Sequence, residues 1–332
     1  MRVFILTEGG SNIGIGHITR CASLYEALED KGMVPEFVIN GDETVNYLLK
    51  DKNHKIFDWL QERERLYSLI KGADIVFIDS YLAGHDVYTA VSSSAKLCVY
   101  IDDNNRIDYP KGIIVNGGIN AEDPDYSVRE DVTYLLGPRY TPLRKEFWDV
   151  PEENIKEKVE SVMITFGGDD NRNMTPKVLK ALAENYPDIL KKVIIGKGFI
   201  NIADVEDAID NKTEIIYYPD SEGMIKVMLE SDIAVSAGGQ TLYELARVGV
   251  PTIAVAVADN QTNNIDGWRK NGFIDYAGWW EDGDLLDNIV KNVESLSDIR
   301  IRDKMAGAGR SLVDGQGAKR IVESLCLMLK NI

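Results

Sequence analysis

The stretch VFILTEGG, residues 3–10, decides how this chain folds. A short apolar run with β-branched residues that ends in two glycines is typical of a buried parallel strand followed by a tight loop. Apolar residues then recur at spacings of three and four from Ile18 to Leu28, which predicts an amphipathic helix ending near Gly32. Strand, glycine loop and helix in this order indicate the first unit of an α/β domain.

The same pattern repeats along the chain and restarts after a Pro-rich linker at 137–156. We therefore predict an α/β protein with two Rossmann-like domains, 1–145 and 146–332, facing each other across a cleft. The last helix of the second domain could pack back on the first. Strands are predicted at residues 3–6, 37–39, 75–78, 97–101, 161–166, 193–195, 233–235 and 252–257.

The composition of the 332-residue chain is that of a folded globular protein with an acidic excess. Apolar residues make up 44%, enough to bury a sizeable core. Asp and Glu number 54 and Lys and Arg 37, which gives a formal net charge of −17. Nucleic acids and membrane surfaces are bound mainly through basic residues, so we expect neither as a partner. Any site for an anion must be locally non-acidic.

Cysteine and histidine are too few and too scattered for a metal or redox site. The three cysteines include no Cys-x-x-Cys pair, and the three histidines lie far apart in the sequence. We expect no metal and no cofactor. The chain starts directly with a predicted strand and has no apolar stretch of about 20 residues. A cytoplasmic protein is the expectation, and the sequence leaves its oligomeric state open.

The first motif with chemical meaning is Gly14-Ile15-Gly16-His17. The glycines allow close backbone approach, and His17 at the start of a helix can serve as a general base. The dinucleotide fingerprint fails because Thr19 occupies its third glycine position, and no Walker loop occurs in the chain. The alternative is a tight turn with a helix-capping histidine.

Acidic residues follow two of the predicted strands. Asp79 ends the strand at 75–78 and Tyr81 follows it, while Asp102 and Asp103 follow the strand at 97–101. Ligands of open α/β sheets bind at these carboxyl ends, so Asp79 and Tyr81 are candidate catalytic residues. The alternative for the acids is a cap of the next helix or an Asx-turn.

A second constellation predicts a nucleotide site. Its glycines lie between a strand and a helix, where backbone N–H groups can bind a diphosphate. Glu244, one turn into that helix, could accept the ribose hydroxyls, or it could simply suit the helix dipole. The predicted binding residues are Ser236, Ala237, Gly238, Gly239, Thr241 and Glu244, with Asn260 and Gln261 after the next strand and Gly167 and Gly168 after the strand at 161–166.

Taken in order, these motifs resemble the UDP-2,4-diacetamido-2,4,6-trideoxy-hexose hydrolases of pseudaminic acid biosynthesis and the related spore-coat polysaccharide proteins. More distantly, they resemble the lipid II glucosaminyltransferase class of GT-B enzymes. The resemblance rests on Gly14-Ile15-Gly16-His17 with Arg20, on Asp79-Ser80-Tyr81, and on the segments 136–144, 166–169 and 236–244.

The resemblance implies a GT-B fold, with a sugar-binding catalytic N-terminal domain and a nucleotide-binding C-terminal domain. It implies a metal-free hydrolysis of a UDP-sugar to UDP and free sugar, in which water activated by His17 attacks the anomeric carbon with inversion. Tyr81 would contact the sugar and Glu244 the ribose, and Gly14, Gly16 and Arg20 would join the substrate site.

Two alternatives remain open at this point. A GT-B glycosyltransferase would pass the sugar to an acceptor, and a lipid acceptor would need a basic or apolar membrane-facing surface. A non-catalytic nucleotide-sugar-binding partner would keep its function when His17 is replaced by Asn.

Overall fold

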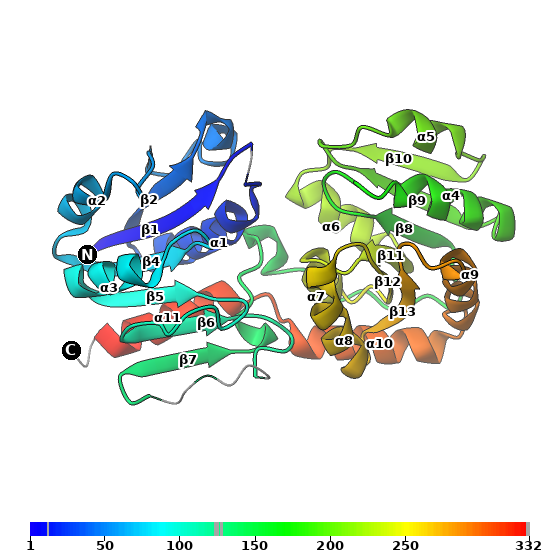
Figure 1. Cartoon of the computed structure of the whole chain (residues 1–332). Helices are drawn as coiled ribbons and strands as arrows, with labels where there is room; N and C mark the ends of the chain where they lie inside the picture. Colours follow the sequence, from blue (N-terminus) through cyan, green and yellow to red (C-terminus); the bar gives the residue numbers. More distant parts are fainter. Residues whose placement is uncertain (12, 123–125, 127–128, 330–332) are drawn as a thin grey trace. The chain divides into compact units, whose positions relative to one another are not determined.

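The structure, a computed structural model, describes residues 1–11, 13–122, 126 and 129–329. The chain forms two compact units. Unit 1 comprises Met1–Lys145 together with Gly315–Ile332, and unit 2 comprises Glu146–Asp314. Each unit is a parallel β-sheet with helices along its strands (Figure 1). The predicted α/β class with two Rossmann-like domains is confirmed by these two sheets.

Over its described residues, unit 1 has a seven-stranded sheet in the order β3-β2-β1-β4-β5-β6-β7, with neighbouring strands parallel. The order reverses between β1 and β4, which leaves room beyond the carboxyl ends of these strands. The strands are β1 (Arg2–Gly9), β2 (Val34–Gly41), β3 (His54–Ile56), β4 (Ala73–Asp79), β5 (Ala95–Ile101), β6 (Gly112–Asn116) and β7 (Val132–Leu136). The helices are α1 (Gly16–Asp30), α2 (Arg63–Ile70), α3 (His85–Ser94) and α11 (Gly317–Leu329), with short 3₁₀ helices at Glu43–Leu48, Pro138–Tyr140 and Lys145–Phe147, the last crossing into unit 2.

Unit 2, over its described residues, has a six-stranded parallel sheet in the order β10-β9-β8-β11-β12-β13. Here the order reverses between β8 and β11. The strands are β8 (Ser161–Thr165), β9 (Leu190–Ile195), β10 (Thr213–Tyr217), β11 (Ile233–Ala237), β12 (Thr252–Ala256) and β13 (Ile274–Trp279). The helices are α4 (Met174–Asn185), α5 (Ile202–Asp207), α6 (Ser221–Leu229), α7 (Thr241–Val248), α8 (Thr262–Lys270), α9 (Leu285–Ser295) and α10 (Ile299–Leu312), with a 3₁₀ helix at Asp259–Gln261.

The central strands are apolar on both faces because helices cover both sides of each sheet. All five residues of β8, β11 and β12 are buried. In unit 1 the core gathers around Trp59, Val76 and Tyr88, and in unit 2 around Ile164, Leu179 and Ile289. Within the described ranges, no helix combines the length and the apolarity needed to cross a membrane.

The C-terminal helix α11 belongs to unit 1, where it packs against α1. A Cβ at Gly317 would overlap the carbonyl of Thr141, so glycine permits the close approach of α11 to this loop. Arg320 donates to the carbonyl oxygen of Arg139, and the Thr141 hydroxyl donates to that of Gly117 at 2.6 Å. The segment 136–144, which contributed to the resemblance, therefore fastens α11 to the sheet.

Candidate active site

The candidate catalytic residues of unit 1 lie where the strand order reverses between β1 and β4. β4 ends at Asp79, and α1, which follows β1, carries His17 in its first turn. Gly10 and Gly14 exchange two backbone hydrogen bonds, of 3.0 and 2.9 Å, and close the loop between β1 and α1. Gly14 has a φ of +84°, a left-handed conformation that glycine adopts readily. This loop directs the start of α1 toward the end of β4.

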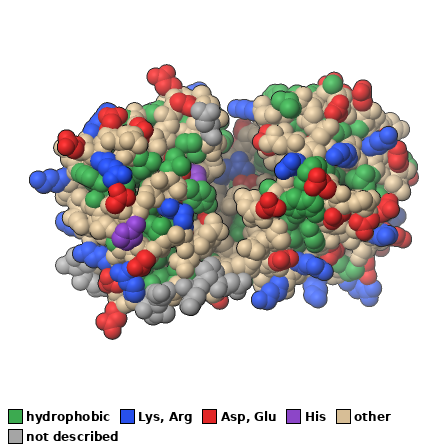
Figure 2. All heavy atoms as spheres, in the orientation of Figure 1, with side chains coloured by type: hydrophobic (Ala, Val, Ile, Leu, Met, Phe, Trp, Pro, Cys, Tyr) green, Lys and Arg blue, Asp and Glu red, His purple; other side chains and the backbone are tan. Residues whose placement is uncertain are grey.

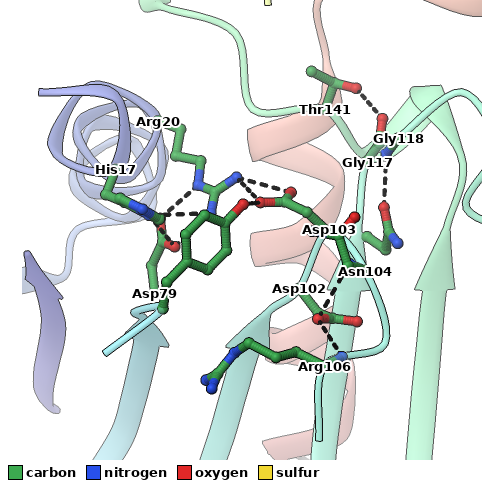
Figure 3. Close-up of polar contacts among 12 residues, drawn as sticks. His17, Arg20, Asp79, Asp102, Asp103, Asn104, Arg106, Gly117, Gly118 and Thr141 are labelled. Carbon is green, nitrogen blue, oxygen red and sulfur yellow. Dashed lines mark hydrogen bonds and ion pairs between the residues drawn. The ribbon is translucent and has the colours of Figure 1, made fainter. Parts of the chain in front are cut away.

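His17 and Asp79 form a hydrogen-bonded pair (Figure 3). Nδ1 of His17 lies 2.7 Å from Oδ1 of Asp79, whose side chain is fully buried. A carboxylate only accepts hydrogen bonds, so Nδ1 carries the proton and Nε2 keeps its lone pair. The His17 side chain is 14% exposed. Nε2 can therefore take a proton while Asp79 stabilises the imidazolium that forms.

Arg20 links this pair to a second carboxylate. Its Nε and Nη2 each lie 2.6 Å from an oxygen of Asp79, and its Nη1 lies 2.9 and 2.8 Å from the oxygens of Asp103. Burial acts to raise the pKa of Asp79, but the Arg20 charge and hydrogen bonds hold it well below the usual range. All three guanidinium nitrogens contact protein side chains. Arg20, predicted as a binding residue, thus fixes the position and charge of Asp79.

Tyr81 lies edge-on to His17, with the ring centroids 4.7 Å apart and the planes at 87°. Its hydroxyl donates to Asp103. Burial and, after it, the Asp103 carboxylate raise the pKa of Tyr81, which keeps the phenol protonated. The residue is nevertheless 48% exposed, so it can also contact a ligand.

Glu8 was not singled out from the sequence, and the structure buries it next to His17. It is 1% exposed, and its Oε1 lies 4.0 Å from Nε2 of His17. Oε1 accepts the backbone N–H of Tyr81 at 2.7 Å, and Oε2 accepts the hydroxyl of Ser80. A signal was available, because Glu8 precedes a glycine pair at the carboxyl end of a central strand, the position that drew attention to Asp79.

Asp102 has a structural role. It accepts hydrogen bonds from the hydroxyls of Tyr109 and Tyr126, at 2.8 and 2.5 Å, and from the backbone N–H of Asn105 at 2.8 Å. These contacts fix the turn after β5 that presents Asp103 to Arg20. The structural alternative that the sequence left open for these acids thus applies to Asp102, which organises the turn after β5.

The other two histidines belong to different elements. His54 lies on β3 with Nδ1 2.9 Å from the Lys52 carbonyl oxygen, and His85 starts α3. In the part of the chain that the structure describes, no group of three or more His, Cys, Asp or Glu side chains is arranged to hold a metal ion.

In unit 2, both glycine pairs follow the strands between which the order reverses. Gly167 and Gly168 come after β8, and Gly238 and Gly239 after β11. β8 and β11 are neighbours in the sheet, with Ser236 opposite Thr165, so the two loops leave the same edge side by side. The sheet thus brings together the two glycine pairs that the sequence predicts as parts of a nucleotide site.

The loop after β11 is fixed by hydrogen bonds and packing against β12 and the segment 261–265. The N–H of Gly238 donates to the Val255 carbonyl at 3.1 Å and to Oε1 of Gln261 at 3.2 Å. Nδ2 of Asn264 donates to the Gly238 carbonyl at 2.8 Å. A Cβ at Gly238 would overlap the buried side chain of Ile265. Gln261 therefore shapes the loop, and the N–H of Gly238 is already used within the protein.

Helix α7 starts directly after this loop. Among the described residues, no hydrogen bond is found for the backbone N–H groups of Gly239, Gln240 and Thr241. Open N–H groups at a helix N-terminus suit a phosphate, because the helix dipole adds partial positive charge there. Glu244 lies one turn further along and is buried. This helix end is the best candidate in unit 2 for an anion site.

Three other predicted residues have different surroundings. Ser236 and Ala237 are buried at the end of β11, where the serine hydroxyl donates to the Ala237 carbonyl at 3.0 Å. Asn260 is exposed on the 3₁₀ helix Asp259–Gln261. The first two belong to the strand that carries the loop, and Asn260 remains accessible to a ligand.

No protein-family profile matches the chain. It is 27% identical over 289 residues to the uncharacterized protein MJ1062 of Methanocaldococcus jannaschii, covering 81% of this chain and 58% of that protein. It is 25% identical over 338 residues to the spore coat polysaccharide biosynthesis protein SpsG of Bacillus subtilis, covering 98% of both.

A third relative comes from Helicobacter pylori and is named as a pseudaminic acid cytidylyltransferase and UDP-2,4-diacetamido-2,4,6-trideoxy-β-L-altropyranose hydrolase. The identity is 25% over 320 residues, covering 95% of this chain and 56% of that protein. The chain thus spans little more than half the length of the Methanocaldococcus and Helicobacter proteins.

Solved structures show the fold. Acinetobacter baumannii MurG has a TM-score of 0.69 and 14% identity, covering 98% of this chain and 99% of MurG. S. aureus MnaA, solved with UDP, has a TM-score of 0.68 and 14% identity, covering 99% and 97%. The chain has the GT-B fold, as the resemblance implied. The chain is thus similar in sequence to SpsG and to the Helicobacter protein, and in fold to MurG and MnaA.

Proposed function

We propose that this protein hydrolyses the anomeric C–O bond of a UDP-linked 2,4-diacetamido-2,4,6-trideoxy sugar and releases UDP and the free sugar with inversion. The observation that carries the proposal is the His17–Asp79 pair, which leaves Nε2 of a partly exposed histidine ready to accept a proton. The sugar class is that of the Helicobacter relative, and the sequence motifs that resemble its family support it.

The chemical step needs one base and one stabilised leaving group. Nε2 of His17 takes a proton from a water molecule, whose oxygen attacks the anomeric carbon. The bond from that carbon to UDP breaks, and its electron pair remains on the β-phosphate oxygen. Asp79 stabilises the imidazolium through Nδ1, and Arg20 keeps Asp79 ionised. A single displacement inverts the anomeric configuration.

Unit 2 supplies the nucleotide contacts in this proposal. The N–H groups of Gly239, Gln240 and Thr241 bind the diphosphate and stabilise the charge that develops on it as UDP leaves. Gly167 and Gly168, on the neighbouring loop, offer further backbone donors. Glu244 accepts the ribose hydroxyls.

Product analysis tests the proposal. Purified protein is incubated with UDP-2,4-diacetamido-2,4,6-trideoxy-β-L-altropyranose and, in parallel, with other UDP-, GDP- and CMP-sugars. UDP is quantified by chromatography, and the first anomer formed is identified by NMR. We expect UDP and the inverted free sugar in equal amounts without an added acceptor. UDP release that requires an added alcohol would show a transferase, and turnover that is unaffected by His17→Asn would exclude His17 as the base.

A further inference from the structure

We infer that Glu8 and His17 together hold the attacking water, each accepting one of its two hydrogens, and that this pair selects water over an alcohol as the nucleophile. The inference rests on the proposed function, whose nucleophile it explains. It gives Glu8 the role of a water-positioning residue.

The distance between the two groups fits one bridging water. Oε1 of Glu8 and Nε2 of His17 are 4.0 Å apart, which is too far for a direct hydrogen bond. With Nδ1 protonated by its bond to Asp79, both facing atoms are acceptors. A water about 2.8 Å from each would form an angle of about 90° between them. This is close to the angle between the two O–H bonds of water, so one molecule satisfies both acceptors.

Glu8 is fixed in place, since Oε1 accepts the N–H of Tyr81 and Oε2 the hydroxyl of Ser80. Neither donor is charged. Among the described residues, the only basic side chain within 4.0 Å of Glu8 is His17. A buried carboxylate without a cation is costly, and Glu8 gains one when His17 takes the proton from water. The pair thus stabilises the charge of the transition state more than that of the ground state.

The two hydrogens of the water have different fates. The hydrogen that faces Nε2 leaves as a proton to His17 while the oxygen bonds to the anomeric carbon. The hydrogen that faces Glu8 stays on the oxygen and becomes the hydrogen of the new anomeric hydroxyl. No charge moves to Glu8, and the remaining lone pairs of the water point away from both acceptors.

An alcohol has one hydroxyl hydrogen and cannot satisfy both acceptors. If it donates to His17, the buried Glu8 carboxylate faces an alkyl group and loses its partner. An unsatisfied buried acceptor is unfavourable, and sites built to bond a group reject analogues that lack it. The second acceptor therefore favours hydrolysis over transfer.

Methanol competition tests this selectivity. Hydrolysis of UDP-2,4-diacetamido-2,4,6-trideoxy-β-L-altropyranose is run in buffer with methanol, and the ratio of methyl glycoside to free sugar is measured by mass spectrometry. Wild type should form almost only free sugar. Glu8→Ala and Glu8→Met, which is of similar size but lacks the acceptor oxygen, should lower kcat at least tenfold and raise the methyl glycoside ratio about tenfold. Glu64→Gln, a carboxylate removal on exposed α2, should change neither. An unchanged ratio in folded Glu8→Met and Glu8→Ala would overturn the inference.

A high-resolution crystal structure of the wild-type protein without substrate tests the water itself. We expect a water within hydrogen-bond distance of both Oε1 of Glu8 and Nε2 of His17, and its loss in Glu8→Ala. Its absence from the wild type would overturn the inference even in an active hydrolase. Conversely, the proposed function fails if the wild type releases no free sugar from UDP-sugars, whether or not the bridging water is present.

Discussion

The two units handle charge in opposite ways. In unit 1 the candidate site is built from ionic side chains, with Arg20 between Asp79 and Asp103. In unit 2 the candidate anion site offers neutral backbone N–H groups at residues 239–241. Acidic and basic side chains are interspersed over each unit in the view of Figure 2. A net charge of −17 therefore does not oppose binding of a diphosphate, because the local backbone dipoles at a helix N-terminus determine whether an anion binds there.

The proposed function assigns separate tasks to the two units. Proton transfer needs a histidine with a fixed tautomer, which in His17 the hydrogen bond from Nδ1 to Asp79 imposes. Binding a diphosphate needs donors that remain when the substrate is absent, which a helix end provides. Changes in unit 1 should thus affect kcat, and changes in unit 2 should affect the affinity for UDP.

The largest expected effect is on catalysis by unit 1. His17→Ala should lower kcat by about 10³-fold, since general-base catalysis contributes about 10² to 10⁴. The Kd of UDP, measured by calorimetry, should stay within about twofold of wild type because the proposed UDP contacts lie in unit 2. His85→Ala, at the exposed start of α3, serves as the matched control and should change neither. An equal loss of rate and UDP affinity would point to a structural role for His17.

Gly238→Ala should weaken the binding of UDP by unit 2. Its Cβ would overlap Ile265 and displace the loop that leads into α7. We expect the Kd of UDP to rise at least tenfold, while kcat at saturating substrate changes much less. Gly307→Ala, in open space on α10, is the control and should leave UDP binding intact. Unaltered UDP affinity in Gly238→Ala would argue against an anion site at this helix end.

Asp79→Asn tests the charged network through stability. Removing one charge of a buried ion pair costs about 3 kcal/mol, and we expect a clear fall in Tm at pH 7. The folded-state pKa of Asp79 is depressed, so its contribution is fully present above the unfolded pKa of about 3.9 and is lost as the pH falls through the lower folded value. The stability gap between wild type and Asp79→Asn should therefore narrow below about pH 4. A gap that is constant with pH would refute the depressed pKa.

A smaller effect is expected at Glu244, the one carboxylate assigned to the nucleotide. Wild type should bind UDP at least about tenfold more tightly than 2′-deoxy-UDP, because losing a hydrogen bond to a charged group costs about 1.5–3 kcal/mol. Glu244→Ala should remove this preference in competition binding. If the preference persists, Glu244 does not bind the ribose, and its carboxylate instead stabilises α7 by interacting with the positive end of the helix dipole.

Much of the architecture follows from the sequence because the central strands are the most apolar. β1, β4, β8 and β11 are buried runs, and each was predicted at its place. Five strands, namely β3, β6, β7, β10 and β13, are not predicted, and one of them, β6, is an inner strand with four buried residues. The edge strands β3 and β10 have residues that are half-buried or exposed, which resembles loop sequence. They become strands only by pairing with a neighbour, and that pairing is invisible to local patterns.

The candidate site could be predicted only in part. His17 and Asp79 stand out because glycines and strand ends mark them, yet their 2.7 Å contact spans 62 positions in sequence. Arg20 and Gln261 carry side chains suited to ligands, and only the fold shows that the protein itself uses those groups. Glu8 was overlooked because an acid before two glycines also reads as an ordinary turn.

Hydrolysis in H₂¹⁸O tests the central claim most directly, namely that water attacks the anomeric carbon and not the phosphorus. The mass of the released UDP is the decisive measurement, since a free sugar can exchange its anomeric oxygen with solvent by ring opening. The account predicts UDP without ¹⁸O and one ¹⁸O in the freshly formed sugar. UDP that carries ¹⁸O would contradict it, because the bond broken would then be the P–O bond.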